Sequence, residues 1–519
     1  MTLKALTPRP RALAAVTVLA SLVAVACEPP PPAAAPTAAV ASPASAPRAG
    51  ETQVSNAGPA SDPLGPKPEP PVPPPFLPPT PEVFRATGGM TVWLLERRQL
   101  PLVSCDITVP TGASSDPKGK AGLAHVTARM LDEGAGKRGA IDLARALDDL
   151  GARLSTDANA DASFVSLTVL KRNLGAAFAI YADVVTKPRF EAADFARVKD
   201  LWANELLTRE KDPDATARVV YRAVLFGPDH PYGHPWDGSP ASAKAIQLDD
   251  VKRAYGAAFR PDRATMVCAG DVTRQELAST LESAFGGWKA PPTPPPPPVV
   301  PQAPSVPAPR LVLVDRPDAP QSVIAAVKPG IAASDPAEPV LRRVNDAIGG
   351  SFSSRLNQDL REQRGYTYGA RSRYSLSRGP GQVVSWANVV TPKTGDALKA
   401  MLADLSEFAS GGLTEDEVER TRSQARSELV GVYESVEGIS AHLAANASLG
   451  LPPDWEAQAS QRRDSATKAD LDPLARAFYD PAHAIVVVVG PRARVQPLLE
   501  GVGVAGAPEM RDAEGNLVK

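Results

Sequence analysis

Apolar and polar residues follow two patterns along residues 83–505 of this 519-residue chain. Runs of β-branched and apolar residues, each as long as a strand, alternate with segments whose apolar residues recur at helical spacing. The strand-like runs cover residues 92–95, 103–109, 164–170, 310–314, 323–327 and 382–390. The helix-like segments cover residues 122–131, 141–150, 195–207, 338–348, 393–408 and 415–433. Strands mixed with helices in this way predict an α+β fold.

The second half of this pattern repeats the first. Residues 110–117 (PTGASSDP) resemble residues 329–336 (PGIAASDP), and residues 259–270 resemble residues 479–490. The two matches lie far apart in the chain at nearly equal offsets, which indicates a duplicated domain. We therefore predict two homologous α/β sandwich domains, each a mixed sheet packed by helices. They span residues 83–290 and 310–505, and residues 506–519 follow as a tail.

Proline is concentrated in two segments. The chain has 56 prolines, and more than half of them lie in residues 28–81 and 291–309. Residues 28–82 hold mainly Pro, Ala and Ser, so this segment cannot bury enough apolar surface to fold and is expected to be a disordered, semi-extended tether. Residues 291–309 are expected to be a proline-rich linker that holds the two domains apart at a limited distance.

Residues 1–27 have the pattern of a secretory signal peptide. Basic residues precede an apolar run at residues 12–26 that is short for a membrane span and ends in small residues before Cys27. This ending resembles the lipobox of bacterial lipoproteins, in which the cysteine is acylated; a plain signal peptide with a stray cysteine is the alternative. The resemblance implies a lipid anchor in the bacterial cell envelope. Glu28, where aspartate would signal inner-membrane retention, favours the outer membrane with the protein facing the periplasm.

Charge and cysteine content exclude two further classes. Lys and Arg number 56 against 58 Asp and Glu, with no long run of one sign, so no nucleic-acid partner is expected. Three cysteines are too few for a disulfide scaffold. Cys105 and Cys268 lie in apolar, strand-like runs and are expected to be buried thiols rather than a disulfide, although an exported compartment would permit the bond.

Several segments resemble one protein family. Residues 122–131 (GLAHVTARML) are similar to the sequence around the inverted His-x-x-Glu-His motif of the pitrilysin/insulinase family of zinc metallopeptidases. Residues 147–152, 227–233 (GPDHPYG) and 349–368 (GGSFSSRLNQDLREQRGYTY) are also similar to that family. The resemblance covers about residues 85–505. It implies repeated α/β domains that form a half-clamshell around a peptide-sized chamber.

The metal positions that the resemblance implies are incomplete. His125 stands at the first ligand position and Glu205 at the third, but Arg129 replaces the second histidine and Ala128 the general-base glutamate. Zinc held by His125 and Glu205 alone would be weak beside a guanidinium, and alanine cannot activate water. We expect no tightly bound cofactor and no peptidase activity of this chain alone. His125 and Glu205 are interpreted as relics, held by hydrogen bonds or by Arg129.

A second functional pair is intact. Arg361 and Tyr368 match an arginine and a tyrosine that, in this family, reach the zinc-bound substrate. A phenol can donate a hydrogen bond to the developing oxyanion, and an arginine can orient the substrate. The alternative is a solvated charge at a helix end and a packed strand tyrosine.

Some bacterial members of the family are two-chain enzymes, and this sequence resembles the chain that lacks the zinc motif. The resemblance implies a heterodimer with a zinc-bearing homologous subunit, zinc in that partner chain, and peptide substrates. The alternative function is a catalytically inactive lipoprotein of the same fold that binds peptides or acts as a scaffold.

The remaining histidines suggest no metal site. His230 and His234 stand four residues apart, but the prolines and glycine around them prevent a helix, so a binding loop or a simple turn is expected. His442 and His483 have no acidic or cysteine cluster near them in the sequence, and we assign them no chemistry.

Overall fold

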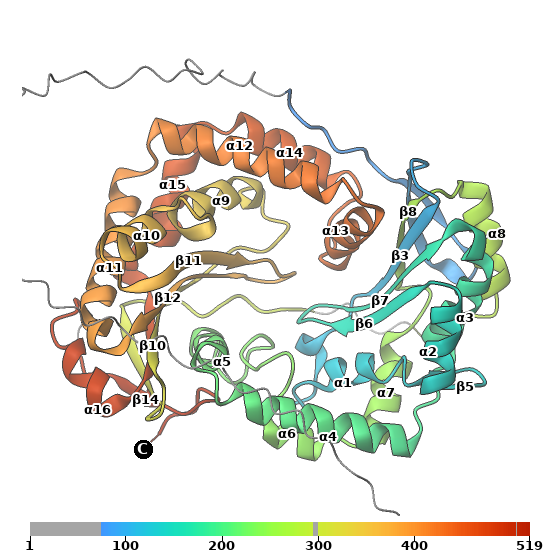
Figure 1. Ribbon diagram of the computed structural model, residues 1–519, viewed down its shortest axis with the longest axis horizontal. Helices are drawn as coiled ribbons and strands as arrows, with labels where there is room; N and C mark the ends of the chain where they lie inside the picture. The colour runs from blue at the N-terminus through green and yellow to red at the C-terminus, as the bar shows by residue number, and fades with distance from the viewer. Residues whose placement is uncertain (1–73, 294–298, 505, 519) are drawn as a thin grey trace, which may run out of the picture. The chain divides into compact units, whose positions relative to one another are not determined.

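The computed structural model describes residues 74–293, 299–504 and 506–518. The predicted signal peptide, Cys27 and most of the predicted tether lie outside the described residues, as do residues 294–298 of the predicted linker. Two six-stranded sheets organise the described chain (Figure 1). Within this part of the chain, no helix is long and apolar enough to cross a membrane.

The first sheet has the strand order β1-β2-β8-β3-β7-β6. β2 and β8 are parallel, and the other neighbours are antiparallel. The strands are β1 (Glu82–Arg85), β2 (Thr91–Glu96), β3 (Leu102–Val109), β6 (Arg153–Ala158), β7 (Ser163–Leu170) and β8 (Thr265–Gly270). A short hairpin, β4 (Gly134–Ala135) and β5 (Arg138–Gly139), stands apart from this sheet.

The second sheet repeats that plan with the order β11-β12-β10-β13-β9-β14. Its strands are β9 (Arg310–Asp315), β10 (Gln321–Pro329), β11 (Thr367–Ser375), β12 (Gln382–Val390), β13 (Ile485–Gly490) and β14 (Glu509–Arg511). β2-β8-β3-β7-β6 thus corresponds to β9-β13-β10-β12-β11, with the parallel pair at the same place. The prediction of an α+β fold with two homologous sandwich domains is confirmed.

Helices cover the sheets in matching positions. The first half contains α1 (Leu123–Arg129), α2 (Ala140–Asp149), α3 (Leu174–Thr186), α4 (Ala192–Arg209), α5 (Pro213–Phe226), α6 (Pro240–Ala245), α7 (Leu248–Ala258) and α8 (Arg274–Phe285). The second half contains α9 (Glu338–Asn345), α10 (Arg355–Asn357), α11 (Thr394–Gly411), α12 (Glu415–Val432), α13 (Val436–Ser448), α14 (Trp455–Ser465), α15 (Lys468–Tyr479) and α16 (Arg492–Val495). Every strand and helix predicted from the sequence overlaps one of these elements.

The two halves exchange a helix. α5, which Asp212 caps at its N-terminus, packs on β10 and β13 of the second sheet, and α13, which Ser435 caps, packs on β3 and β8 of the first (Figure 1). Apolar residues of each helix join the core of the other half's sheet. The prediction that the linker holds the two domains apart is therefore wrong, because each sheet buries one face against a helix of the other domain.

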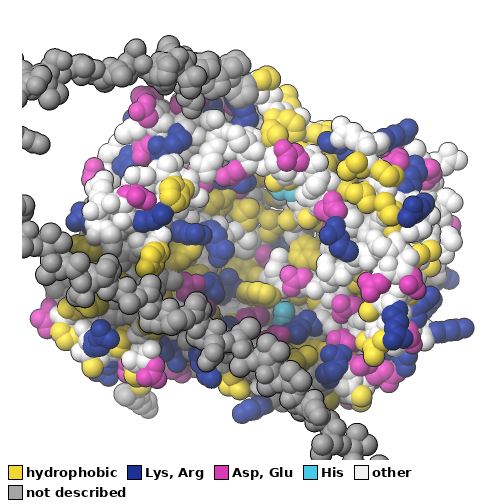
Figure 2. All heavy atoms as spheres, in the orientation of Figure 1, with side chains coloured by type: hydrophobic (Ala, Val, Ile, Leu, Met, Phe, Trp, Pro, Cys, Tyr) yellow, Lys and Arg dark blue, Asp and Glu magenta, His cyan; other side chains and the backbone are white. Residues whose placement is uncertain are grey.

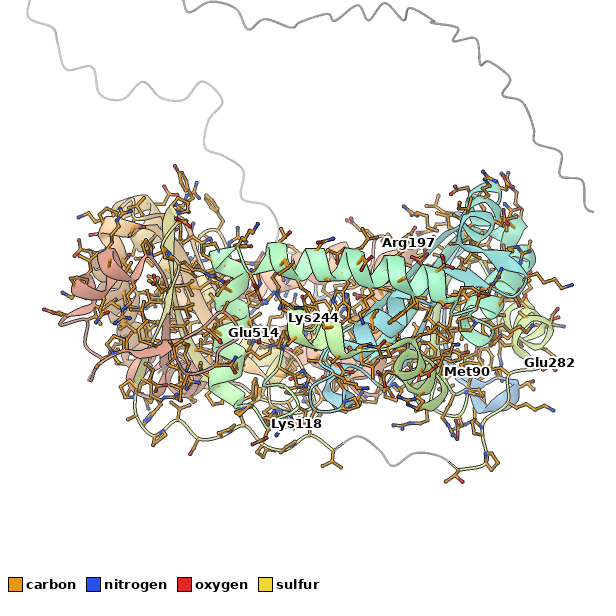
Figure 3. All side chains as sticks on the ribbon, turned by 90° about the horizontal axis from the view of Figure 1, so that it is seen from below. Met90, Lys118, Arg197, Lys244, Glu282 and Glu514 are labelled. Carbon is orange, nitrogen blue, oxygen red and sulfur yellow. A yellow bond between two sulfur atoms is a disulfide. The ribbon has the colours of Figure 1, made fainter. Side chains whose placement is uncertain are left out.

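The C-terminal residues belong to the second sheet. β14 pairs in parallel with β9, and Glu509 accepts two hydrogen bonds from Arg310 at 2.8 and 2.9 Å. The turn that follows lies against α5, where an added side chain at Gly515 would meet Ala223 (Figure 3). The segment expected as a tail thus contributes an edge strand.

Cys105 and Cys268 form a disulfide, which corrects the prediction of free thiols. They stand directly opposite each other on the antiparallel strands β3 and β8, with Cα atoms 4.1 Å apart. Facing residues in such a pair are close enough for the bond. The sequence showed two apolar strands but not the register that aligns these two positions.

Candidate functional site

The segment that carries His125 begins at a tight glycine. Gly122 has φ +86°, and a Cβ there would lie 2.7 Å from the Trp202 ring and 2.8 Å from Gly238. The Asp116 carboxylate accepts hydrogen bonds from the backbone N–H groups of residues 122–124 at 2.8–3.0 Å and so closes the start of α1. Burial raises the pKa of Asp116 to about 7, against the opposing effect of these N–H donors. Helix α1 is thereby fixed against α4.

His125 lies among aromatic rings. Its ring centroid is 5.4 Å from that of Trp236 and 6.3 Å from that of Trp202. Its Nδ1 atom is buried and has no hydrogen-bond partner among the described residues. Burial lowers the pKa of His125, and the charge of Arg129 acts in the same direction. These surroundings favour the neutral imidazole.

Arg129 and Glu205 form a bidentate ion pair between α1 and α4. The two guanidinium nitrogens donate to the two carboxylate oxygens at 2.5 and 3.1 Å. Ala128 is fully buried against Ala124 and Ala158. At the position that the resemblance assigns to the general base, the side chain is thus a packed methyl group. Glu205, at the third ligand position that the resemblance implies, is already paired with a cation.

These residues do not fit a zinc ion. Among the described residues, no three His, Cys, Asp or Glu side chains are grouped so that they could hold a metal. Glu205 is held by Arg129, and a divalent cation placed between His125 and Glu205 would be repelled by the guanidinium. At these positions the side chains form an ion pair between α1 and α4.

Arg361 and Tyr368 lie on the second half, where Arg361 is half-buried and Tyr368 is exposed. Arg361 belongs to a π-helical segment (Gln358–Gln363); its guanidinium lies 4.6 Å from the centroid of the exposed Phe352 ring and 3.4 Å from Glu362. Tyr368 is 89% exposed, at an irregularity near the start of the edge strand β11. The exposure of Tyr368 does not agree with the alternative interpretation, in which this tyrosine is packed against its domain. The π-helical segment of Arg361 is of a kind that is frequent at functional sites.

The loop with His230 joins the halves. His230 is stacked on Phe226, and its Nε2 lies 3.1 Å from the Pro301 carbonyl oxygen of the linker. Tyr232 donates to Asp161 at 2.6 Å and accepts from the Gly379 N–H at 3.1 Å. These contacts give the loop a structural role.

His442 has a partner that the sequence did not show. Its Nε2 lies 2.7 Å from Glu456, which also forms an ion pair with Arg463. Glu456 belongs to α14 and reaches His442 of α13 only in the folded chain, so sequence proximity could not find it. The cluster joins α13 to α14.

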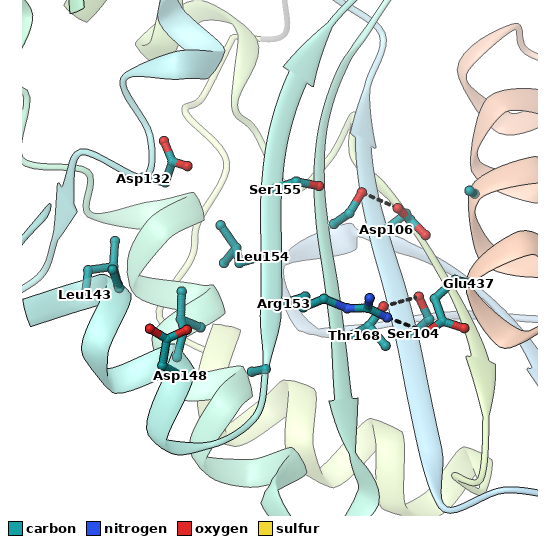
Figure 4. Close-up of a pocket in the computed structure, with 15 residues that line it drawn as sticks. Ser104, Asp106, Asp132, Leu143, Asp148, Arg153, Leu154, Ser155, Thr168 and Glu437 are labelled. Carbon is teal, nitrogen blue, oxygen red and sulfur yellow. Dashed lines mark hydrogen bonds and ion pairs between the residues drawn. The ribbon is translucent and has the colours of Figure 1, made fainter. Parts of the chain in front are cut away.

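Sequence reasoning also missed a polar cavity of about 740 Å³ beside β6 (Figure 4). Its lining includes Ser104 and Asp106 of β3, Arg153 of β6, Thr168 of β7 and Glu437 of α13. The sequence pattern that could have indicated it is the polar residues at alternate positions of β3 and β7, two strands that were interpreted as apolar.

Two family models match the chain. Residues 92–224 match Insulinase (Peptidase family M16), and residues 245–425 match Peptidase M16 inactive domain. An uncharacterized zinc protease of Mycobacterium bovis is 28% identical over 345 residues, which is 66% of this chain and 78% of that protein. A non-peptidase homolog of Helicobacter pylori is 23% identical over 334 residues, which is 62% of this chain and 74% of that protein.

Solved structures have the same fold. The peptidase M16 inactive domain from Pseudomonas fluorescens aligns with a TM-score of 0.74 and 23% identity, over 79% of this chain and 98% of that chain. A chain of complex III2 from Candida albicans aligns with a TM-score of 0.68 and 14% identity, over 81% of this chain and 99% of that chain.

Proposed function

Because the chain belongs to the insulinase family of peptidases, family M16, we propose that it is the subunit of a two-chain peptidase that lacks a zinc centre of its own. It supplies Arg361 and Tyr368 to the zinc site of a homologous partner chain. The observation that carries this proposal is the contrast between the two half-sites. The Arg129–Glu205 ion pair occupies the positions that the resemblance assigns to metal ligands, whereas Tyr368 is exposed with no packing role.

The chemistry of this pair needs no metal ligand from the chain. When water attacks a peptide carbonyl in the partner's site, the Tyr368 hydroxyl donates a hydrogen bond to the oxyanion. Arg361 orients the substrate through its backbone or a carboxylate. The Arg361 guanidinium is held by the Phe352 ring, 4.6 Å from its centroid, and by Glu362 at 3.4 Å.

The proposal includes a membrane anchor. Acylation at Cys27 and the proline-rich segment that follows would tether the folded chain to the outer membrane, on its periplasmic side. Peptides in that compartment are the substrates.

An inactive peptide-binding or scaffold lipoprotein is the second candidate. It is favoured by the similar chain from Helicobacter pylori, whose name describes it as a non-peptidase homolog. That function uses the fold without Arg361 and Tyr368, so substitutions at these two residues discriminate between the candidates.

The test is a reconstituted pair of this chain with a homologue that has an intact His-x-x-Glu-His, sought first in the neighbouring reading frame. Tyr368→Phe and Arg361→Gln are each expected to lower kcat for a fluorogenic peptide by about 10²-fold or more, with the assembly intact by gel filtration. Arg364→Gln is the matched control, because Arg364 is a nearby arginine that is also ion-paired, with Asp359, and has no proposed role toward the substrate. Unchanged hydrolysis in both variants would exclude the subunit role.

A further inference from the structure

The face of the first sheet below α13 changes from apolar to polar across the sheet. At β2 and β8, α13 packs on Trp93, Leu95 and Val267. At β3 and β7 the same face carries hydroxyl and carboxyl groups, and Ser440 of α13 donates a hydrogen bond of 2.9 Å to Ser104. The cavity of about 740 Å³ opens over this polar part and reaches the free edge of β6.

The duplicated half shows that the fold does not require these polar groups. Asp106 faces Ser166 across β3 and β7, whereas the corresponding pair of the second sheet is Ala325 and Trp386 across β10 and β12. The cavity under α5 at that place is only about 80 Å³. The polar cavity is therefore a feature of the first half alone.

Asp106 is an incompletely paired carboxylate in this cavity. It is 5% exposed; one oxygen accepts from the Ser166 hydroxyl, and Oδ2 has no hydrogen-bond partner among the described residues. A buried carboxylate without a counter-ion is costly, and burial raises the pKa of Asp106 against the hydroxyls of Ser166 and Ser440.

The charges around the cavity favour a cation. On the polar face, Asp106 and Glu437 line it together with one basic residue, Arg153, whose side chain is 81% exposed and lies 3.1 Å from Glu437; Asp132 and Asp148 line the other side, across β6. Arg153 and Ser155 stand opposite Thr168 and Ser166 on the polar face, and Leu154 points to the other face, toward the apolar part of the lining (Figure 4).

We propose that this cavity binds the cationic side chain of a lysine or arginine in a peptide substrate, with Asp106 as its counter-ion. The inference rests on the proposed function only in that the ligand is a peptide. An extended peptide along the free edge of β6 presents alternate side chains to the two faces of the strand. A basic side chain on the polar face reaches Asp106 with its charged end, while its neighbours in sequence face Leu143 and Leu147.

The test measures binding of dye-labelled short peptides to the purified chain without a partner, by fluorescence anisotropy. A peptide with one central arginine is expected to bind about tenfold or more tightly than the same peptide with citrulline, since hydrogen bonds between charged groups exceed neutral ones. Asp106→Asn should abolish this preference and Ser166→Ala should weaken it. Asp149→Asn, an equal charge change at an exposed residue of α2 outside the cavity, should preserve it.

The outcomes separate this inference from the proposed function. Equal affinity for both peptides, or a preference that survives Asp106→Asn in a variant with unchanged thermal stability, overturns the cation site. If the chain binds arginine amide with the same dependence on Asp106 but binds neither peptide, the cation site stands, and the proposal that its cation comes from a peptide is overturned. In both cases the effect of Tyr368→Phe on peptide hydrolysis by the reconstituted pair tests the proposed function independently.

Discussion

Arg129 donates hydrogen bonds to both carboxylate oxygens of Glu205, at 2.5 and 3.1 Å. The two residues come from α1 and α4, at two positions where the family resemblance implies zinc ligands. The guanidinium of Arg129 carries a fixed positive charge and neutralises the Glu205 carboxylate, as a metal ion would otherwise do. The ion pair thus occupies the carboxylate through which Glu205 would bind a metal ion.

Arg129→His should create a zinc site. Histidines at 125 and 129 would lie on one face of α1, and Glu205 would lose its ion pair and become free to bind. We expect near-stoichiometric zinc in this variant and little in the wild-type chain, measured by elemental analysis after dialysis. Because Ala128 still provides no base, the variant should not hydrolyse peptides.

Two controls make this measurement specific. Glu205→Ala added to Arg129→His should remove the zinc. Arg197→His places the same substitution on an exposed part of α4 (Figure 3), and it should bind none. Near-stoichiometric zinc in the wild type would contradict the argument that the ion pair excludes the metal.

Reduction of the Cys105–Cys268 disulfide should destabilise the first half. The bond closes a long loop and lies in the main hydrophobic core of that half. Denaturant unfolding with and without reductant should differ by about 2–4 kcal/mol. A Cys105→Ala, Cys268→Ala variant serves as control, since its stability should not respond to reductant; an equal response in the variant would place the effect elsewhere.

Acid should weaken the contact between α13 and α14. Burial alone would raise the pKa of Glu456, but the hydrogen bond from His442 and the charge of Arg463 lower it to about 2. The unfolded chain binds protons near the ordinary value of 4.5, so this group's contribution is complete above that pH and is lost as pH falls toward 2. Unfolding free energy should fall by about 3 kcal/mol over this window from this group.

Glu456→Gln isolates that contribution. It should flatten this part of the stability profile and lower stability at neutral pH, because Arg463 would be left buried without its counter-ion. Glu434→Gln, at an exposed residue just before α13, should leave the profile unchanged. A profile with the same slope in both variants would assign the acid sensitivity to other carboxylates.

Cys27→Ala should release the chain from the membrane fraction. If Cys27 is acylated, the substitution removes the attachment point, and the protein should appear in the soluble periplasmic fraction and lose labelling by fatty acid. Ser42→Ala, in the same proline-rich segment, is the control. Soluble wild-type protein without fatty-acid label would favour the plain signal peptide.

The sequence predicted the helices, the strands and the duplication, because the spacing of apolar residues that marks a helix or a strand depends only on residues close together in the chain. What the sequence could not show was set by contacts across the fold. The register that aligns Cys105 with Cys268 and the exchange of α5 and α13 depend on which faces meet in space. Asp106 was hidden for a related reason: its strand reads as apolar, and only the equivalent Ala325 of the second sheet shows that its charge is exceptional.

Tyr368→Phe should leave stability unchanged. Its side chain is 89% exposed, so loss of the hydroxyl removes no buried contact, and the free energy of unfolding should shift by less than about 0.5 kcal/mol. Tyr181→Phe is the matched comparison, because this hydroxyl is buried, accepts from the Ile107 N–H at 2.9 Å and donates to the Val165 carbonyl oxygen at 2.5 Å. Its removal leaves a buried N–H unpaired and should cost about 1–3 kcal/mol. Denaturant unfolding of the two variants therefore separates a tyrosine kept for packing from one kept for a partner, and a loss at Tyr368 as large as that at Tyr181 would identify Tyr368 as structural.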